Sequence, residues 1–135
     1  MEPTKFLALD VGERRIGVAA AESTTKLAYP LTTIEVDGTE IEQLTSLVRE
    51  ENAAQFVVGY PRNSQGEPTK QTAIVEVFVA RLAKFGMPIS YQDESLTSVA
   101  AEKYLQSHKK AYSKADIDAH AAAIILTDYM ESHYA

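Results

Sequence analysis

The chain has 135 residues, of which 45% are hydrophobic and 24% charged, and its formal net charge is −6 at pH 7. This length and composition predict a single domain, residues 1–135, with a proper hydrophobic core. No apolar stretch approaches the roughly 20 residues that span a bilayer. The absence of cysteine excludes disulfides and thiolate metal sites, which favours a cytoplasmic protein. The acidic balance excludes whole-molecule attraction to nucleic acid, so such a partner must meet a local basic surface.

The first part of the chain predicts three β-strands joined by short connections. An apolar run at residues 6–11 ends at Gly12, and residues 15–20 follow a tight turn as a hairpin partner. Residues 29–36 form a third strand, rich in β-branched side chains and ended by Asp37-Gly38. Such short connections predict antiparallel pairing.

From Thr39 onward, helices are predicted to alternate with strands. Thr39 can cap a first helix with one apolar face, and residues 56–59 form an all-apolar fourth strand. A second helix ends at Gly86, and its expected core stripe comprises Ile74, Val77, Phe78, Leu82 and Phe85. Residues 88–93 supply a fifth strand, and residues 97–106 and 113–130 two further helices. The pattern predicts an α/β fold: a mixed five-stranded sheet, three antiparallel strands then two parallel ones, flanked by helices.

Asp10 is a charged residue within the apolar first strand. An unpaired carboxylate in such a place costs several kcal/mol unless a cation compensates it. A structural salt bridge or hydrogen bond would explain its position, and so would a metal or substrate site at the end of the strand. The pattern around Asp10 alone leaves both explanations open.

Two other carboxylates are expected near Asp10. Asp118 lies on the apolar face of the last helix and should point toward the sheet, with a cap or buried salt bridge as the alternative. Asp93 and Glu94 are adjacent and therefore point to opposite sides of the sheet. Glu94, at the end of the fifth strand, is expected to be the one that reaches inward.

Three carboxylates converging from two strands and a helix make an oxygen-lined, strongly negative site. Like charges raise each other's pKa, so the site becomes favourable when Mg²⁺ or Mn²⁺ binds. Mg²⁺ combines carboxylates with substrate phosphate oxygens, which predicts a phosphodiester substrate, and two ions about 3.5–4 Å apart would clamp the attacking and leaving oxygens. His108, His120 and His133 are too scattered in the sequence to suggest a metal cluster.

Four segments of the chain carry motifs in a fixed order. The first two are LDVGERRIGVA at residues 9–19 and VVGYPRNSQG at residues 57–66, a strand followed by a Gly-x-Pro loop. The last two are DESLTSVA at residues 93–100 and DIDAHAAAIIL at residues 116–126. Together they resemble the motifs of the YqgF (RuvX-like) family, described as Holliday junction resolvases and pre-16S rRNA nucleases. The similarity runs from about Lys5 to Glu131.

The resemblance implies a ribonuclease H-like fold and a metal-dependent nuclease that hydrolyses phosphodiester bonds. It assigns catalysis and the binding of Mg²⁺ or Mn²⁺ to Asp10, Glu94 and Asp118, the three acids that the pattern also selects. It implies pre-16S ribosomal RNA as the preferred substrate and branched DNA as the alternative. In this fold the fourth strand lies between the first and fifth, whose backbones are therefore about 10 Å apart. The length of a glutamate at position 94 would help to bridge that gap.

One position departs from the family pattern, which commonly has arginine directly after the glutamate where this chain has Ser95. A contact to phosphate or to the acids could be supplied instead by Arg14, Arg15 or Arg62. These three and Lys114 are predicted to surround one end of the sheet and bind nucleic acid. For a lysine in a loop, simple solvation is the alternative. Tyr60 could stack on a base or serve packing.

Two other functions fit parts of the pattern. The first motif also resembles the phosphate-binding hairpin of the actin, sugar-kinase and heat-shock chaperone ATPases, but 135 residues leave no room for their second domain. Ser95 and the net charge of −6 would suit a catalytically weak nucleic-acid-binding module for ribosome assembly. Magnesium-dependent cleavage separates the nuclease from that module.

No surface stripe indicates an oligomeric state, although junction resolution would favour a two-fold dimer.

Overall fold

Five strands form one mixed sheet in the order β3-β2-β1-β4-β5. The computed structural model describes residues 3–63, 65–94, 103, 106 and 113–134. The strands are β1 (Lys5–Val11), β2 (Arg15–Glu22), β3 (Tyr29–Glu35), β4 (Gln55–Pro61) and β5 (Ile89–Glu94). β1 pairs antiparallel with β2, and β2 with β3, whereas β4 runs parallel to both β1 and β5. The predicted mixed sheet is confirmed.

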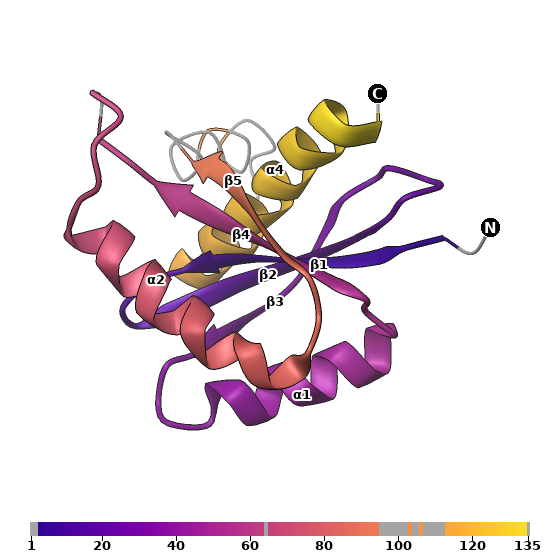
Figure 1. Ribbon diagram of the computed structural model, residues 1–135, viewed down its shortest axis with the longest axis horizontal. Helices are drawn as coiled ribbons and strands as arrows, with labels where there is room; N and C mark the ends of the chain where they lie inside the picture. Colours follow the sequence, from indigo (N-terminus) through magenta and orange to yellow (C-terminus); the bar gives the residue numbers. More distant parts are fainter. Residues whose placement is uncertain (1–2, 64, 95–102, 104–105, 107–112, 135) are drawn as a thin grey trace.

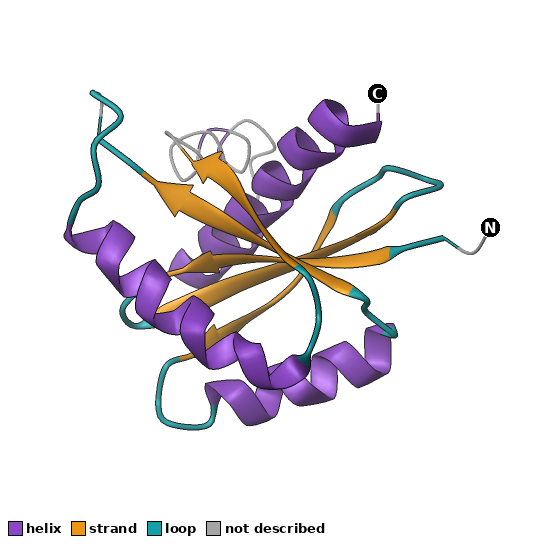
Figure 2. Cartoon of the chain, in the orientation of Figure 1, coloured by secondary structure: helices purple, strands orange, loops and turns teal. Residues whose placement is uncertain are grey.

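Helices cover both faces of this sheet. α1 (Glu40–Glu51) and α2 (Lys70–Arg81) lie on one face, and α4 (Lys114–Tyr134) crosses the other (Figures 1 and 2). α4 begins after Ser113. The Ser113 hydroxyl accepts a hydrogen bond from the Asp116 N–H, and the Ser113 N–H donates one to the Asp116 carboxylate. The helix predicted at residues 97–106 lies outside the described residues, apart from Lys103 and Gln106.

Two details of the helices differ from the sequence-based expectations. Thr39 precedes α1, but its side chain makes no capping hydrogen bond and donates to Asp37 instead. In α2, Val75 is fully buried and Val77 is 68% exposed, so Val77 does not belong to the core stripe. The buried residues Val75, Phe78 and Leu82 are spaced i, i+3 and i+7 and share one face, whereas Val77 lies on the opposite side of the helix. α2 ends at Arg81, and a 3₁₀ turn, Leu82–Phe85, leads to Gly86.

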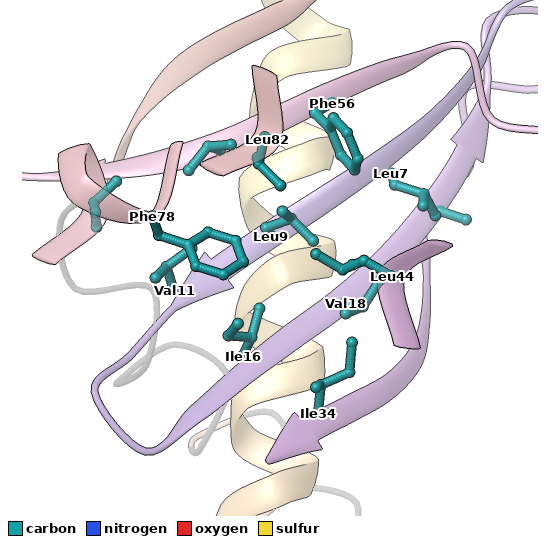
Figure 3. Close-up of a cluster of buried hydrophobic side chains, with 13 residues drawn as sticks. Leu7, Leu9, Val11, Ile16, Val18, Ile34, Leu44, Phe56, Phe78 and Leu82 are labelled. Atoms are coloured by element: carbon teal, nitrogen blue, oxygen red, sulfur yellow. The ribbon is translucent and has the colours of Figure 1, made fainter. Parts of the chain in front are cut away.

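The sheet separates two hydrophobic clusters. The cluster beneath α1 and α2 contains the β1 residues Leu7, Leu9 and Val11 (Figure 3). The cluster beneath α4 contains Phe6 and Ala8, together with Ala122 and Ile125 of the helix. Because neighbouring strand residues alternate between faces, Asp10 follows Phe6 and Ala8 onto the side of α4.

No helix in the described ranges is long and apolar enough to cross a membrane.

Candidate active site

Asp10 lies near the end of β1, on the face that α4 covers. It is partly buried and pairs across the ladder with Gly17 of β2. Burial raises the pKa of Asp10 well above its ordinary value, and a hydrogen bond with Glu94 and the negative charges of Glu94 and Asp118 raise it further. In the metal-free protein the uncharged form of Asp10 is thereby favoured.

Glu94 reaches Asp10 by crossing over β4 at Gly59. β4 separates the strands that carry the two acids, and Pro61 of β4 is the register partner of Glu94. A Cβ atom on Gly59 would lie 2.7 Å from Glu94 Oε2 and 2.6 Å from Ile125 Cδ1. The missing side chain at Gly59 thus leaves the space that the Glu94 carboxylate occupies.

Asp118 enters the site from α4, where the helix meets the sheet. A Cβ atom on Gly17 would overlap the backbone carbonyl of Asp118, so only glycine permits this approach. Arg15, two residues before Gly17, donates from Nε to Asp118 Oδ2 at 2.7 Å. Both partners are partly buried, so solvent screens this charged hydrogen bond less than a surface pair.

The three acids line one cavity of about 210 Å³. Its wall is completed by Val11, Gly12, Arg15, Pro61 and Gln71. Gln71, from the first turn of α2, is held there because its Nε2 donates to the Val11 carbonyl at 2.7 Å. The cavity therefore combines elements from both faces of the sheet around the ends of β1, β4 and β5.

The donor set of the cavity suits a hard divalent cation. Carboxylate oxygens are the ligands that Mg²⁺ and Mn²⁺ prefer. As they stand, however, no three carboxylate or imidazole groups among the described residues are arranged to hold one ion together. Asp10 and Glu94 are in contact with each other, and Asp118 is held by Arg15. The carboxylate oxygens of these residues thus fit such an ion in their chemistry, while Asp118 is bonded to Arg15.

The other predicted site residues fall around the same end of the sheet. Arg14 is exposed in the β1–β2 turn, Arg62 is exposed after β4, and Lys114 is exposed at the start of α4. Arg15 instead turns inward to Asp118. Ser95 lies outside the described residues. The roles of these basic residues, like those of the three acids, stay predictions.

Sequence reasoning missed Gln71 in the cavity wall, Gly59 beneath the Glu94 carboxylate, and one ion pair. Gly59 carried a usable signal, because a glycine inside a buried strand often marks a close approach by another group. Gln71 carried none, since a polar residue in the first turn of a helix is ordinary. The pairing of Arg15 with Asp118 joins residues 103 positions apart and needs the three-dimensional fold to be found.

Solved structures give the class of this fold. RuvC from T. thermophilus in complex with a Holliday junction substrate superposes with a TM-score of 0.59, covering 96% of this chain and 94% of that chain at 13% identity. A second Thermus thermophilus RuvC structure gives a TM-score of 0.56. At such low identity the likeness shows the fold alone, which is ribonuclease H-like, as predicted.

Sequence matches give the family. A family model described as "RuvX: Holliday junction resolvase" matches residues 4–132. A Chloroflexus aurantiacus protein is 45% identical over 132 residues, 94% of this chain and 86% of that protein, and a Roseiflexus sp. protein is 41% identical over 97% and 96% of the two chains. Both bear the name "Putative pre-16S rRNA nuclease". The chain belongs to the RuvX family.

Proposed function

We propose that this protein is a metal-dependent nuclease in which Asp10, Glu94 and Asp118 bind Mg²⁺ or Mn²⁺ and promote hydrolysis of a phosphodiester bond. The observation that carries the proposal is the convergence of these acids on one cavity from β1, β5 and α4. Membership of a nuclease family supports it independently. A purely structural role for Asp10 is less well supported, because two other acids act on its charge and Arg15, in the same cavity wall, is bonded to Asp118 instead.

Each residue of the cavity has a physical task in this proposal. The bound ion would supply positive charge to the phosphate and lower the pKa of a bound water. Asp10 from β1 and Glu94, whose carboxylate lies over Gly59, would provide oxygen ligands to the ion, and Asp118 would provide them from α4. Arg15, once Asp118 turns to the ion, is placed to donate hydrogen bonds to a phosphate oxygen.

We propose the 5′ segment of pre-16S ribosomal RNA as the substrate. The curated relatives that carry this name match nearly the whole chain, including one from Crocosphaera subtropica that is 41% identical over 100% of it. This substrate also implies a cytoplasmic location. Branched DNA is the second candidate, favoured by the description of the family model. Arg14, Arg62 and Lys114 would contact either substrate, Arg14 and Lys114 through its phosphate backbone.

A cleavage assay with Mn²⁺ tests the proposal, using a precursor rRNA 5′ segment and a four-way DNA junction. Glu94→Gln and Asp10→Asn should each slow cleavage by two orders of magnitude or more, on the order of what one lost electrostatic contact costs. Glu42→Gln is the matched control, because Glu42 is an exposed acid of α1 that does not line the cavity. Asp10→Asn should also leave the metal-free protein as stable as the wild type or more so, since repulsion is relieved.

The outcomes separate the alternatives. Cleavage of the RNA but not of the junction supports the rRNA substrate, and the reverse result supports junction resolution. Cleavage of neither at any Mn²⁺ concentration would favour the nucleic-acid-binding module. Unfolding of the Asp10→Asn variant would show that Asp10 has a structural role.

A further inference from the structure

Tyr60, Tyr91 and Arg62 form a cluster at the ends of β4 and β5, which we name the aromatic platform. The two tyrosine rings meet edge to face, with centroids 4.7 Å apart and an angle of 64°. The Arg62 guanidinium lies 5.0 Å from the centre of the Tyr60 ring. Tyr91 keeps 45% of its surface exposed, and the Arg62 side chain keeps 46%. The platform therefore presents π surface and a cation to solvent.

The platform adjoins the acid cavity but lies on the other face of the sheet. Tyr60 follows Val58, and Tyr91 follows Ile89, onto the face that α1 and α2 cover. The same two strands carry Pro61 and Glu94, which pair with each other and line the acid cavity. Tyr91 and Glu94 are three residues apart, about 10 Å along the strand. A chain that crosses the ends of β4 and β5, whose arrowheads lie side by side in Figure 1, can touch both places.

Packing alone does not account for the position of Tyr91. A tyrosine that serves a core buries most of its ring, whereas Tyr91 is nearly half exposed on the edge strand of the sheet. The half-exposed Tyr29, at the opposite edge, differs because its hydroxyl accepts from Lys5 Nζ at 2.8 Å and donates to Glu51 Oε1 at 3.3 Å. Tyr29 thus has an evident structural role, and Tyr91 has a free surface next to a candidate active site.

The charges around the platform favour a base over a phosphate. Asp93 lies 3.7 Å from Arg62 Nε, and Glu76 is close enough to Tyr91 to act on it electrostatically. These acids would repel a phosphate held against the rings, but a base has no net charge. Both members of the Arg62–Asp93 pair are well exposed, so Arg62 can leave Asp93 at little cost and lie over a base.

We propose that the aromatic platform stacks an unpaired nucleobase of the substrate, on the nucleotide beside the phosphodiester held at the acid cavity. This inference rests on the proposed nuclease function and narrows its substrate class to single-stranded or locally unpaired nucleic acid. Aromatic rings bind any base through its π face, but only when the base has left its stack in a duplex.

Binding to a short single-stranded RNA labelled with fluorescein tests the proposal. Fluorescence anisotropy is measured in Mg²⁺ with all proteins in an Asp10→Asn background, so that cleavage does not interfere. Tyr91→Ala should raise the dissociation constant about tenfold, within the range of one lost base–aromatic stack. Tyr91→Phe should bind like the parent protein, since it retains the ring. Tyr29→Ala is the matched control, because Tyr29 is 41% exposed at the far edge of the sheet, and it should also bind like the parent.

Two modified ligands sharpen the test. Tyr91→Ala should have no effect on a fully paired duplex of the same length, whose bases are already stacked. The second modified ligand is an RNA with one abasic nucleotide at the contacted position. The parent should bind it about tenfold less tightly than the intact RNA, whereas Tyr91→Ala should bind the two RNAs equally well. Three results would refute the platform. Tyr91→Ala could bind the single strand as tightly as the parent does, or it could lose equal affinity for single strand and duplex. The third is that the parent itself fails to bind the single strand.

The cleavage assay reports separately on the proposed nuclease function. If Tyr91→Ala loses single-strand affinity but the wild type cleaves no substrate, the platform stands as a base-binding site and the nuclease proposal fails. If the wild type cleaves and Tyr91→Ala binds normally, the nuclease proposal stands and the platform fails.

Discussion

Gly59→Ala should disable the candidate active site at a modest cost in stability. The new methyl group would lie 2.7 Å from Glu94 Oε2 and 2.6 Å from Ile125 Cδ1, about 0.7–0.8 Å short of ordinary contact. Both atoms are at the ends of side chains that can move, so the fold should survive with a loss of about 1–3 kcal/mol. Glu94, however, must leave its place beside Asp10. A displacement of about 1 Å can cost on the order of 100-fold in rate.

Single-turnover cleavage with Mn²⁺ and unfolding in urea measure the two effects. Val57→Ile is the matched control, because Val57 is buried on the same strand and face and packs in the cluster beneath α4. It adds bulk without approaching the acids, so it should lower stability similarly and leave the cleavage rate near that of the wild type. Full activity in Gly59→Ala would refute the idea that the carboxylate of Glu94 passes over Gly59.

Two more predictions concern charge in the metal-free cavity. Because burial, and then Glu94, raise the pKa of Asp10 above its ordinary 3.8, the folded protein keeps a proton that the unfolded chain releases. The free energy of unfolding should thus fall as pH rises from 3.8 through the raised pKa, by about 1.4 kcal/mol per unit between the two values. Asp10→Asn should lack most of this loss, and unfolding of both proteins across pH measures the difference. Parallel curves for the two proteins would contradict the prediction. Arg15→Gln should lower metal-free stability by up to about 1 kcal/mol and tighten Mn²⁺ binding several-fold by freeing Asp118. Calorimetric titration measures that affinity, and weaker binding would show that Arg15 does not compete with the ion.

The antiparallel and parallel pairing of the strands could be predicted from the sequence because it depends on local signals, whereas the place of the fourth strand between the first and fifth was implied by the family resemblance. Short connections joined the first three strands, and the helical period that follows Thr39 required crossovers. The stripe of α2 was predicted less well, because Ile74, Val75, Val77 and Phe78 are all apolar and the sequence pattern does not show which of them face the core.

The composition of the cavity was only partly accessible from sequence. Asp10, Glu94 and Asp118 could be selected because each places a carboxylate where an apolar or neutral residue would cost less. The inward turn of Arg15 could not be predicted, since an arginine after a turn is usually exposed and its partner lies on a distant helix. The space above Gly59 likewise depends on how α4 packs against β4, which no short segment determines.

The Arg15–Asp118 pair gives the protein a counter-charge of its own. Small metal-binding domains often cannot fold until the ion arrives, because their ligands repel one another. Here a guanidinium on β2 offsets the charge of one of the three acids, and burial and the neighbouring acids raise the pKa of a second, Asp10, which favours its uncharged form. If these acids hold an ion as proposed, the fold would not depend on the supply of divalent cations, and binding of the ion would be a separate event.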